Sequence, residues 1–318
     1  MNGSLYLEPW NPHYGSPADL SDERGSKAEV DPGVEIVPEE WHPIGVEPTL
    51  ALPELVHFVD GVRRIDGRLN WEPPDSPYRK PLIAASYAAG AIRCDLRAGR
   101  AELVGEKVER RLFALFADPP TLGEPPACYR GQAIEGRDVH ALEAGMQTSM
   151  RALELKVADH ARIDGGVLFV DGPLQGNNYQ TDTLGFVKTH ETRYLPDQLA
   201  LVVAGLGEHQ RTPVFKISSP QWGRYSWYTR LPEHVGSGWS GIVRVECPAD
   251  LDITAAIRFA HLSTAILPRF ASVSYKDPRA PQNLVPIAGL EKRLRGLLGD
   301  PKVLHRLLMR ALAAGVPA

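Results

Sequence analysis

The sequence has few cysteines, no long apolar run and no excess of basic residues, and each shortage excludes a class of protein. Its 318 residues include three widely spaced cysteines, Cys94, Cys128 and Cys247. They do not fit a disulfide framework or a Cys/His zinc site. No stretch of about eighteen apolar residues occurs, so we expect no membrane-spanning helix. Any metal ion is therefore expected to be a hard cation held by carboxylates.

The charge balance is slightly acidic. Lysine and arginine number 35 against 39 aspartate and glutamate residues, which gives a net charge of −4. Proteins that coat duplex nucleic acid are usually basic, so a nucleic-acid role here requires a local basic surface. The first residues show neither the basic segment nor the apolar stretch of a secretory signal, so we expect a cytoplasmic protein.

The composition predicts a proline-rich N-terminal arm followed by one domain. Residues 1–50 are rich in proline, glycine and acids and show no helical or strand period. We expect either a loop-like arm that is ordered against a partner or a wrap over the protein's own surface. Residues 51–318 carry strand and helix patterns without an internal repeat or a clear linker, which predicts a single domain.

Apolar periodicity predicts the elements of that domain. We interpret LVHFVDGVRRIDGRLNW, from Leu55, as two strands joined by a tight turn at Asp60-Gly61. Further strands are expected at 82–96, 102–108, 167–172, 183–190, 213–218, 224–231 and 241–247. A long amphipathic helix is expected over 138–162, with shorter helices at 196–204, 253–266, 290–298 and 302–313. The sum predicts an α/β or α+β fold with a central sheet and a C-terminal helical pair.

Two of the predicted strands end in the same residues, Val-Asp-Gly. Each apolar run delivers one carboxylate, Asp60 or Asp171, at the carboxyl end of its strand. Two acids at adjacent strand ends can chelate a divalent ion and can together bridge two ions. The alternative is that Asp-Gly is an ordinary turn pair.

The long predicted helix offers a third acid, Glu143 or Glu154, on one flank of its apolar stripe. Rise per residue, counted back through the connecting loop, brings Glu154 nearer the level of Asp171 and favours it over Glu143. Asp60, Glu154 and Asp171 then form an Asp-Glu-Asp cluster on a sheet followed by a helix. This is the arrangement of RNase H-like folds, in which carboxylates hold two metal ions for phosphodiester hydrolysis.

Four segments, in order, resemble the NurA nuclease family, whose members act with the HerA hexameric ATPase in DNA end processing. They are FVDG, ALELKVADHARIDGGVLFVDGPL, GFVKTH and YKDPRAPQNLVPIAGLEKRLRGLLGD, and they cover most of the span from Leu55 to Asp300. The resemblance implies an RNase H-like core with a mixed central sheet flanked by helices, extra strands and a C-terminal helical pair. It also implies a homodimeric, metal-dependent DNA nuclease with 5′–3′ exonuclease and single-strand endonuclease activity, acting in double-strand break processing.

The family pattern also implies roles for single residues. Asp60, Glu154 and Asp171 match the metal-binding acids, and Lys188 matches a lysine on the following strand that would neutralise charge on the scissile phosphate. The implied cofactor is Mn²⁺ or Mg²⁺, in two ions. Many family members carry a histidine in the C-terminal segment, which is absent here between Tyr275 and Glu291.

The loss of that histidine leaves oxygen ligands as substitutes. Asp277 is the stronger candidate and Asn283 the next, because an ionised carboxylate binds a hard cation better than an amide does. Arg279 would hold a phosphate by a bidentate contact. The competing interpretation is structural: Asp277 caps a turn and Arg279 pairs with an acid such as Glu291.

Nucleic-acid contacts are expected from basic and aromatic residues. Arg63 and Arg64, together with Arg68, follow Asp60 and would line a basic passage in a dimer or a channel fed by the ATPase. Trp227 lies in QWGRYSWYTR, where aromatic and basic residues alternate, and would stack on unpaired bases. Such aromatics are also typical of a core strand. Two other functions stay open: an inactive scaffold that docks on the ATPase, and an RNA-directed nuclease.

Overall fold

The computed structural model of the chain describes residues 28–47, 49–73, 77–161, 166–174, 182–190, 192–220, 222–232 and 238–314. The described chain is a mixed α/β protein and forms two compact units. Unit 1 comprises the described residues of Met1–Phe58, Cys94–Arg100 and Gly165–Ala288; unit 2 comprises those of Val59–Arg93, Ala101–Asp164 and Gly289–Ala318. Neither unit coincides with an arm of residues 1–50 or a domain of residues 51–318.

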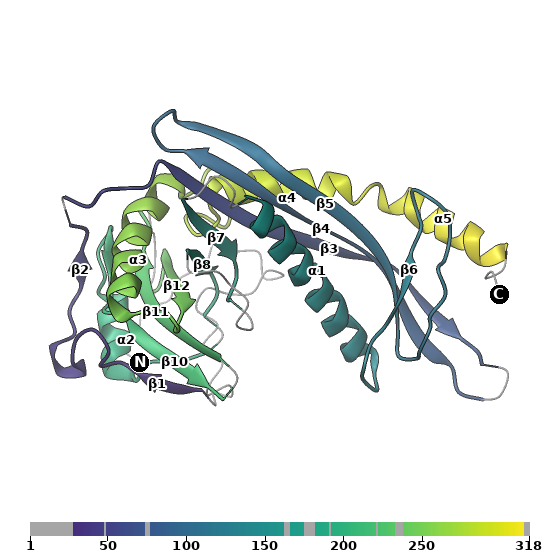
Figure 1. Ribbon diagram of the computed structural model, residues 1–318, viewed down its shortest axis with the longest axis horizontal. Helices are drawn as coiled ribbons and strands as arrows, with labels where there is room; N and C mark the ends of the chain where they lie inside the picture. Colours follow the sequence, from purple (N-terminus) through teal and green to yellow (C-terminus); the bar gives the residue numbers. More distant parts are fainter. Residues whose placement is uncertain are drawn as a thin grey trace, which may run out of the picture. The chain divides into compact units, whose positions relative to one another are not determined.

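Unit 1 is a mixed sheet with helices packed on it (Figure 1). Its strands follow the order β1 (Glu29–Asp31), β10 (Phe215–Ser219), β11 (Trp222–Arg230), β12 (Ile242–Pro248), β8 (Thr183–Val187) and β7 (Val167–Asp171), with the first residues of β3 next to β7. β7 and β8 run parallel, whereas β8, β12, β11, β10 and β1 pair antiparallel. Helix α3 (Ile253–Ile266) packs on β11 and β12, and α2 (Asp197–Ala204) follows β8.

The part of the expected arm that the structure describes belongs to the unit 1 fold. β1 pairs with β10, and β2 (Ile44–Gly45) pairs with β9 (Gln210–Arg211). Between them, after a short 3-10 helix at Pro38–Glu40, Trp41 is buried in a core cluster with Phe215 and Tyr228. From residue 28 onward this segment packs on unit 1 through short strands and one aromatic anchor, which agrees with the alternative of a wrap over the protein's own surface. Residues 1–27 lie outside the described residues.

Unit 2 is built on long strands. β3 (Leu55–Trp71), β4 (Lys80–Asp95), β5 (Arg100–Ala114) and β6 (Arg130–Ala133) lie in that order, and β5 pairs with β6 in parallel. The hairpin between β4 and β5 turns at Gly99, whose φ of 62° suits a glycine. Three helices, α1 (Val139–Ala161), α4 (Val285–Leu297, whose first turn belongs to unit 1) and α5 (Pro301–Ala313), complete the unit.

Side-chain alternation places α1 and α4 on opposite faces of the unit 2 strands. Gly61 of β3 lies against Glu154 of α1, whereas the next residue, Val62, packs with Leu290 and Leu294 of α4. Successive residues of a strand point to opposite faces, so the two helices cover different sides. By the same alternation, Asp60, two residues before Val62, points to the face of β3 that α4 covers.

One predicted feature of this region is wrong. The segment from Leu55 is one 17-residue strand, with no turn at Asp60-Gly61. Gly61 is needed for close approach rather than for a turn, because a Cβ atom there would lie 2.3 Å from Oε1 of Glu154. Asp60 is therefore inside a strand, and of the two Val-Asp-Gly sequences only the one at Asp171 ends a strand in the described structure.

The remaining elements agree closely with the sequence patterns. The long helix expected over 138–162 is Val139–Ala161, the helix at Ile253–Ile266 has the expected bounds, and α4 begins five residues earlier than predicted. Asp252 caps α3 by accepting a hydrogen bond from the backbone of Ala255. Among the described helices, none has the length and hydrophobicity needed to cross a membrane.

Candidate metal centre

In unit 2 an acidic cluster surrounds the middle of β3. Asp60 is 6% exposed and Glu154 is 7% exposed, so both carboxylates are withdrawn from bulk water. A carboxylate oxygen of Asp60 and one of Glu291, on α4, lie within 4.8 Å of each other. Two buried or half-buried carboxylates this close repel each other as anions, and a divalent cation between them offsets that repulsion.

The two acids of helix α1 have different surroundings. Oε1 of Glu154 points at the backbone of Gly61, next to Asp60. Glu143 accepts a hydrogen bond of 2.7 Å from Arg68, and its side chain is 39% exposed. That hydrogen bond lowers the pKa of Glu143, as a surface ion pair does. Of the two candidates, Glu154 is the one that the fold holds against β3, at Gly61, on the strand face opposite the one to which Asp60 turns.

Glu291 is a site candidate that sequence reasoning missed. From the sequence, Glu291 is considered only as a possible ion-pair partner of Arg279. The helix predicted there begins at Leu290, which gives Glu291 no place beside β3. In the structure α4 begins at Val285, which puts Glu291 in its second turn. The stretch from Val285 contains a proline in the first turn, a position typical of a helix start, and this signal was available.

In unit 1 the corresponding acid is Asp171, at the end of β7. Its Oδ2 accepts a 2.6 Å hydrogen bond from Nζ of Lys188, and both side chains are largely buried. Its Oδ1 is buried and has no hydrogen-bond partner within the described part of the chain. Gly172 follows with φ of 101°, which turns the chain away and leaves the carboxylate at the strand end. A buried carboxylate oxygen with open coordination is what a hard cation binds.

Lys188 also joins a second group of polar residues. Its Nζ lies 3.5 Å from Oδ1 of Asn283, and the Asn283 amide donates to Oδ2 of Asp277. Oδ1 of Asp277 accepts a 2.8 Å hydrogen bond from the backbone of Arg279, whose side chain also pairs with Asp277 at 3.7 Å. Asp277 thus caps its own turn and orients the buried Asn283; its role as a metal ligand stays a prediction.

Within unit 1 the start of β3 and the strand β7 are in register. A Cβ atom on Gly166 would lie 2.4 Å from the carbonyl oxygen of Leu55, and the rings of Phe58 and Phe169 stack with centroids 5.5 Å apart. Phe58 follows Leu55 by three residues, and Phe169 follows Gly166 by three residues. Because the contacts advance in the same direction along both strands, the two strands run parallel here. Asp171 follows Phe169 by two residues, as Asp60 follows Phe58.

The residues present fit a hard divalent ion. In unit 2, Asp60, Glu154 and Glu291 offer carboxylate oxygens, which Mg²⁺ and Mn²⁺ prefer. In unit 1, the orphaned Oδ1 of Asp171 has capacity for a further partner. The three cysteines are free thiols and take no part in this donor set.

Two of the residues expected to contact nucleic acid have structural roles in this fold. The guanidinium of Arg64 donates to the carbonyls of Leu298 and Gly299 and to Asp66, so it caps the end of α4. Trp227 has no exposed surface, and its indole donates to Ser263 at 2.9 Å. The segment 222–230 is a core strand, and the ring cannot reach a nucleic acid. Arg63 is exposed, and its contact stays a prediction.

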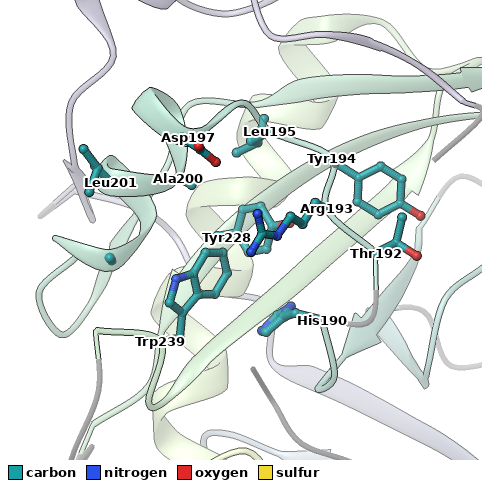
Figure 2. A pocket seen from close by; sticks show the side chains of 11 residues that line it. His190, Thr192, Arg193, Tyr194, Leu195, Asp197, Ala200, Leu201, Tyr228 and Trp239 are labelled. Atoms are coloured by element: carbon teal, nitrogen blue, oxygen red, sulfur yellow. The ribbon is translucent and has the colours of Figure 1, made fainter. Parts of the chain in front are cut away.

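A cavity of about 250 Å³ opens in unit 1 beside helix α2 (Figure 2). The side chains of His190, Tyr194, Tyr228 and Trp239 surround it, with Leu201 of α2 at its edge. Burial lowers the pKa of His190 to about 4, although its hydrogen bond to the carbonyl of Ile242 acts in the opposite direction. The imidazole is therefore neutral at physiological pH.

Comparison with known proteins gives fold likeness alone. No family model matches the sequence, and no curated protein matches it. The solved structures similar to this chain include the NurA nuclease from Sulfolobus solfataricus, at 14% identity and a TM-score of 0.48, covering 87% of this chain and 89% of that one. They also include endonuclease V from Bacillus subtilis (12% identity, TM-score 0.32, 79% and 85% covered) and endonuclease V from Ciona intestinalis bound to inosine-containing DNA (10%, 0.33, 80% and 90%).

Proposed function

We propose that this chain is a metal-dependent nuclease that hydrolyses phosphodiester bonds. The observation that carries the proposal is the pair of carboxylates on β3 and α4, Asp60 and Glu291, with Glu154 held against the neighbouring glycine. Withdrawn acids gathered around one strand are typical of metal-binding and catalytic sites. The resemblance of the FVDG and VLFVDG segments to NurA nucleases agrees with this chemistry.

The family pattern implies that the acids of the two strands act together. Asp60, Glu154, Asp171 and Glu291 would hold one or two divalent ions through oxygen atoms. When bound, such ions acidify a water molecule and stabilise charge on the reacting phosphate. The protein's own contribution is to present each carboxylate from a regular element, Asp60 from β3, Asp171 from β7, Glu154 from α1 and Glu291 from α4.

Lys188 would act on the phosphate. Its ammonium group is held by Asp171 and lies near Asn283, so its position is fixed from two sides. From there it would donate a hydrogen bond to a non-bridging phosphate oxygen and offset the charge that develops during hydrolysis. Asp277 and Arg279 would support this arrangement, Asp277 by orienting Asn283 or as a further oxygen ligand, and Arg279 by contacting phosphate.

The finer assignment rests on the sequence resemblance. We propose an RNase H-like core, DNA as the substrate, Mn²⁺ or Mg²⁺ as the ion, and action in double-strand break processing in the cytoplasm. A HerA-type hexameric ATPase and a second copy of the chain are the proposed partners. Arg63, an exposed residue of β3, is the proposed DNA contact.

A cleavage assay tests the proposal. Single- and double-stranded DNA, and RNA of the same sequence, labelled at the 5′ or the 3′ end, would be incubated with Mn²⁺, Mg²⁺ or EDTA. We expect metal-dependent cleavage that EDTA abolishes and that is absent from Asp171→Asn. Cleavage of RNA alone would replace DNA as the substrate. No cleavage with either metal, with or without a HerA-type ATPase, would leave the chain as a non-catalytic scaffold.

A further inference from the structure

Unit 2 contains a basic cavity that the candidate metal centre does not use. It has a volume of about 440 Å³ and lies between β5 and the loop that leads into β6. Four basic side chains and one acid line it: Lys107, Arg110, Arg111, Arg130 and Glu109. In a protein with a net charge of −4, this is a local concentration of positive charge.

The register of the strands makes the cavity electrostatically costly. β5 and β6 run parallel, and Arg111 is the direct cross-strand partner of Arg130. Like charges directly opposite each other destabilise a sheet. Arg111 is partly balanced by Glu109, which accepts its hydrogen bond at 2.8 Å, while Arg130 is exposed. An anion bound between the two strands offsets this repulsion.

The remaining lining favours a phosphate. One amino group of Arg110 donates a hydrogen bond to the carbonyl of Leu298. The buried Nε of Arg110, like that of Arg111, has no hydrogen-bond partner in the described chain. Lys107 pairs only loosely with Glu109, at 3.8 Å, and is 56% exposed. Guanidinium groups match the tetrahedral oxygens of a phosphate by paired hydrogen bonds.

We propose that this cavity binds a backbone phosphate of the nucleic-acid substrate. The inference rests on the proposed nuclease function, since it names a surface that would bind the substrate strand at a phosphate other than the one that is cleaved. It also replaces the basic surface expected at Arg64. Lys107 and Arg130 are the exposed members, and Arg110 and Arg111 are half-buried.

Binding without cleavage tests this. A fluorescein-labelled single-stranded oligonucleotide would be titrated in EDTA at several salt concentrations, with the unaltered protein and with Lys107→Gln/Arg130→Gln. We expect the double variant to raise the dissociation constant by about tenfold at low salt. The plot of the log association constant against log salt should also become less steep, by about 0.7 for each phosphate that is no longer neutralised. Arg79→Gln, which removes an exposed arginine elsewhere in unit 2, is the matched control and should change neither. Thermal melting checks that each variant is folded.

Two outcomes would overturn the inference. Unchanged affinity and salt slope in the double variant would do so, even if the protein cleaves DNA. Binding of inorganic phosphate that depends on these residues, with no effect on the oligonucleotide, would make the cavity a small-anion site. Parallel cleavage assays separate the two proposals: a protein that binds through this cavity but never cleaves refutes the nuclease assignment and leaves the inference standing.

Discussion

Gly61 and Glu154 approach so closely that the smallest side chain would not fit between them. A Cβ atom on Gly61 would lie 2.3 Å from Oε1 and 3.1 Å from the carboxyl carbon of Glu154. β3 therefore needs glycine here to admit a carboxylate from helix α1 against the strand. The contact joins a strand and a helix far apart in the sequence and fixes which acid of α1 lies against β3.

Gly61→Ala should therefore impair activity more than it impairs folding. The methyl group displaces the Glu154 carboxylate, so we expect a fall in metal-dependent cleavage of at least about tenfold and a higher metal concentration for half-maximal activity. Gly296→Ala is the control, because that glycine lies in α4 with nothing within 4 Å and alanine there should stabilise the helix by about 1 kcal/mol. Equal loss of activity in both variants would contradict the role of this contact.

Asp60→Asn and Asp171→Asn should each abolish metal-dependent cleavage and weaken metal binding measured by calorimetry. An amide keeps the shape of the side chain but loses the negative charge that a hard cation requires. Asp171→Asn also breaks the ion pair with Lys188, so a small fall in melting temperature is expected for it. Full activity in either folded variant would remove the proposed centre.

Much of the fold follows from local pattern, and the parts that do not are set by tertiary contacts. Helices α1 and α3 were predictable because their apolar residues recur with the helical period over many turns. The break assigned at Asp60-Gly61 was wrong because glycine serves equally for turns and for close approach, and only the position of Glu154 decides between them. Strand β1 escaped prediction because three residues paired to β10 carry no period of their own.

The candidate centre was only partly predictable for the same reason. Asp171 follows an apolar strand, which is a local signal, and Glu154 could be favoured over Glu143 by length along the helix. Glu291 depends on where α4 begins, and helix ends are the least certain part of a pattern. The burial of Trp227 depends on its hydrogen bond to Ser263 of α3, which no spacing in the sequence reveals.

Asp277 can be assigned by separating metal affinity from stability. Both of its oxygens accept hydrogen bonds in their own loop, from Arg279 and Asn283. We expect Asp277→Ala to lower the melting temperature in EDTA, because the turn loses its cap, and to leave unchanged the metal concentration for half-maximal cleavage. Arg79→Gln serves as a surface control. A raised metal requirement with an unaltered melting temperature would instead identify Asp277 as a ligand.

Glu35 ties the N-terminal segment to unit 1. Its carboxylate accepts hydrogen bonds of 2.8 and 2.9 Å from both amino groups of Arg211, which is 1% exposed. Glu35→Gln leaves a buried guanidinium without its anion, so we expect a loss of about 3 kcal/mol in the free energy of unfolding by urea. Exposed Glu39→Gln should have little effect.

The same hydrogen bonds change how a partner role of the arm is tested. Deletion up to Val46 removes Glu35 and Trp41, so it should destabilise unit 1 rather than leave it folded. Deletion of residues 1–27 spares β1 and is the variant with which to test binding to a HerA-type ATPase and dimer formation. Normal binding and normal dimers in that variant would exclude the first 27 residues from both roles.

His190 should make the protein less stable in mild acid. Burial is the main cause that lowers its pKa to about 4, from about 6.5 in the unfolded chain, and the nearby Arg244 lowers it further. Between these two values the unfolded chain binds a proton that the folded chain excludes. The free energy of unfolding must therefore decrease as the pH falls from about 6.5 toward 4, by about 3 kcal/mol at most. His190→Gln keeps a donor for the Ile242 carbonyl but has no proton to gain, so urea unfolding in EDTA at pH 7 and pH 4.5 should show a smaller loss than in the unaltered protein. His42→Gln, at an exposed histidine, is the matched control and should retain the full loss. An unchanged pH dependence in His190→Gln would mean that other groups, not this imidazole, set the acid sensitivity.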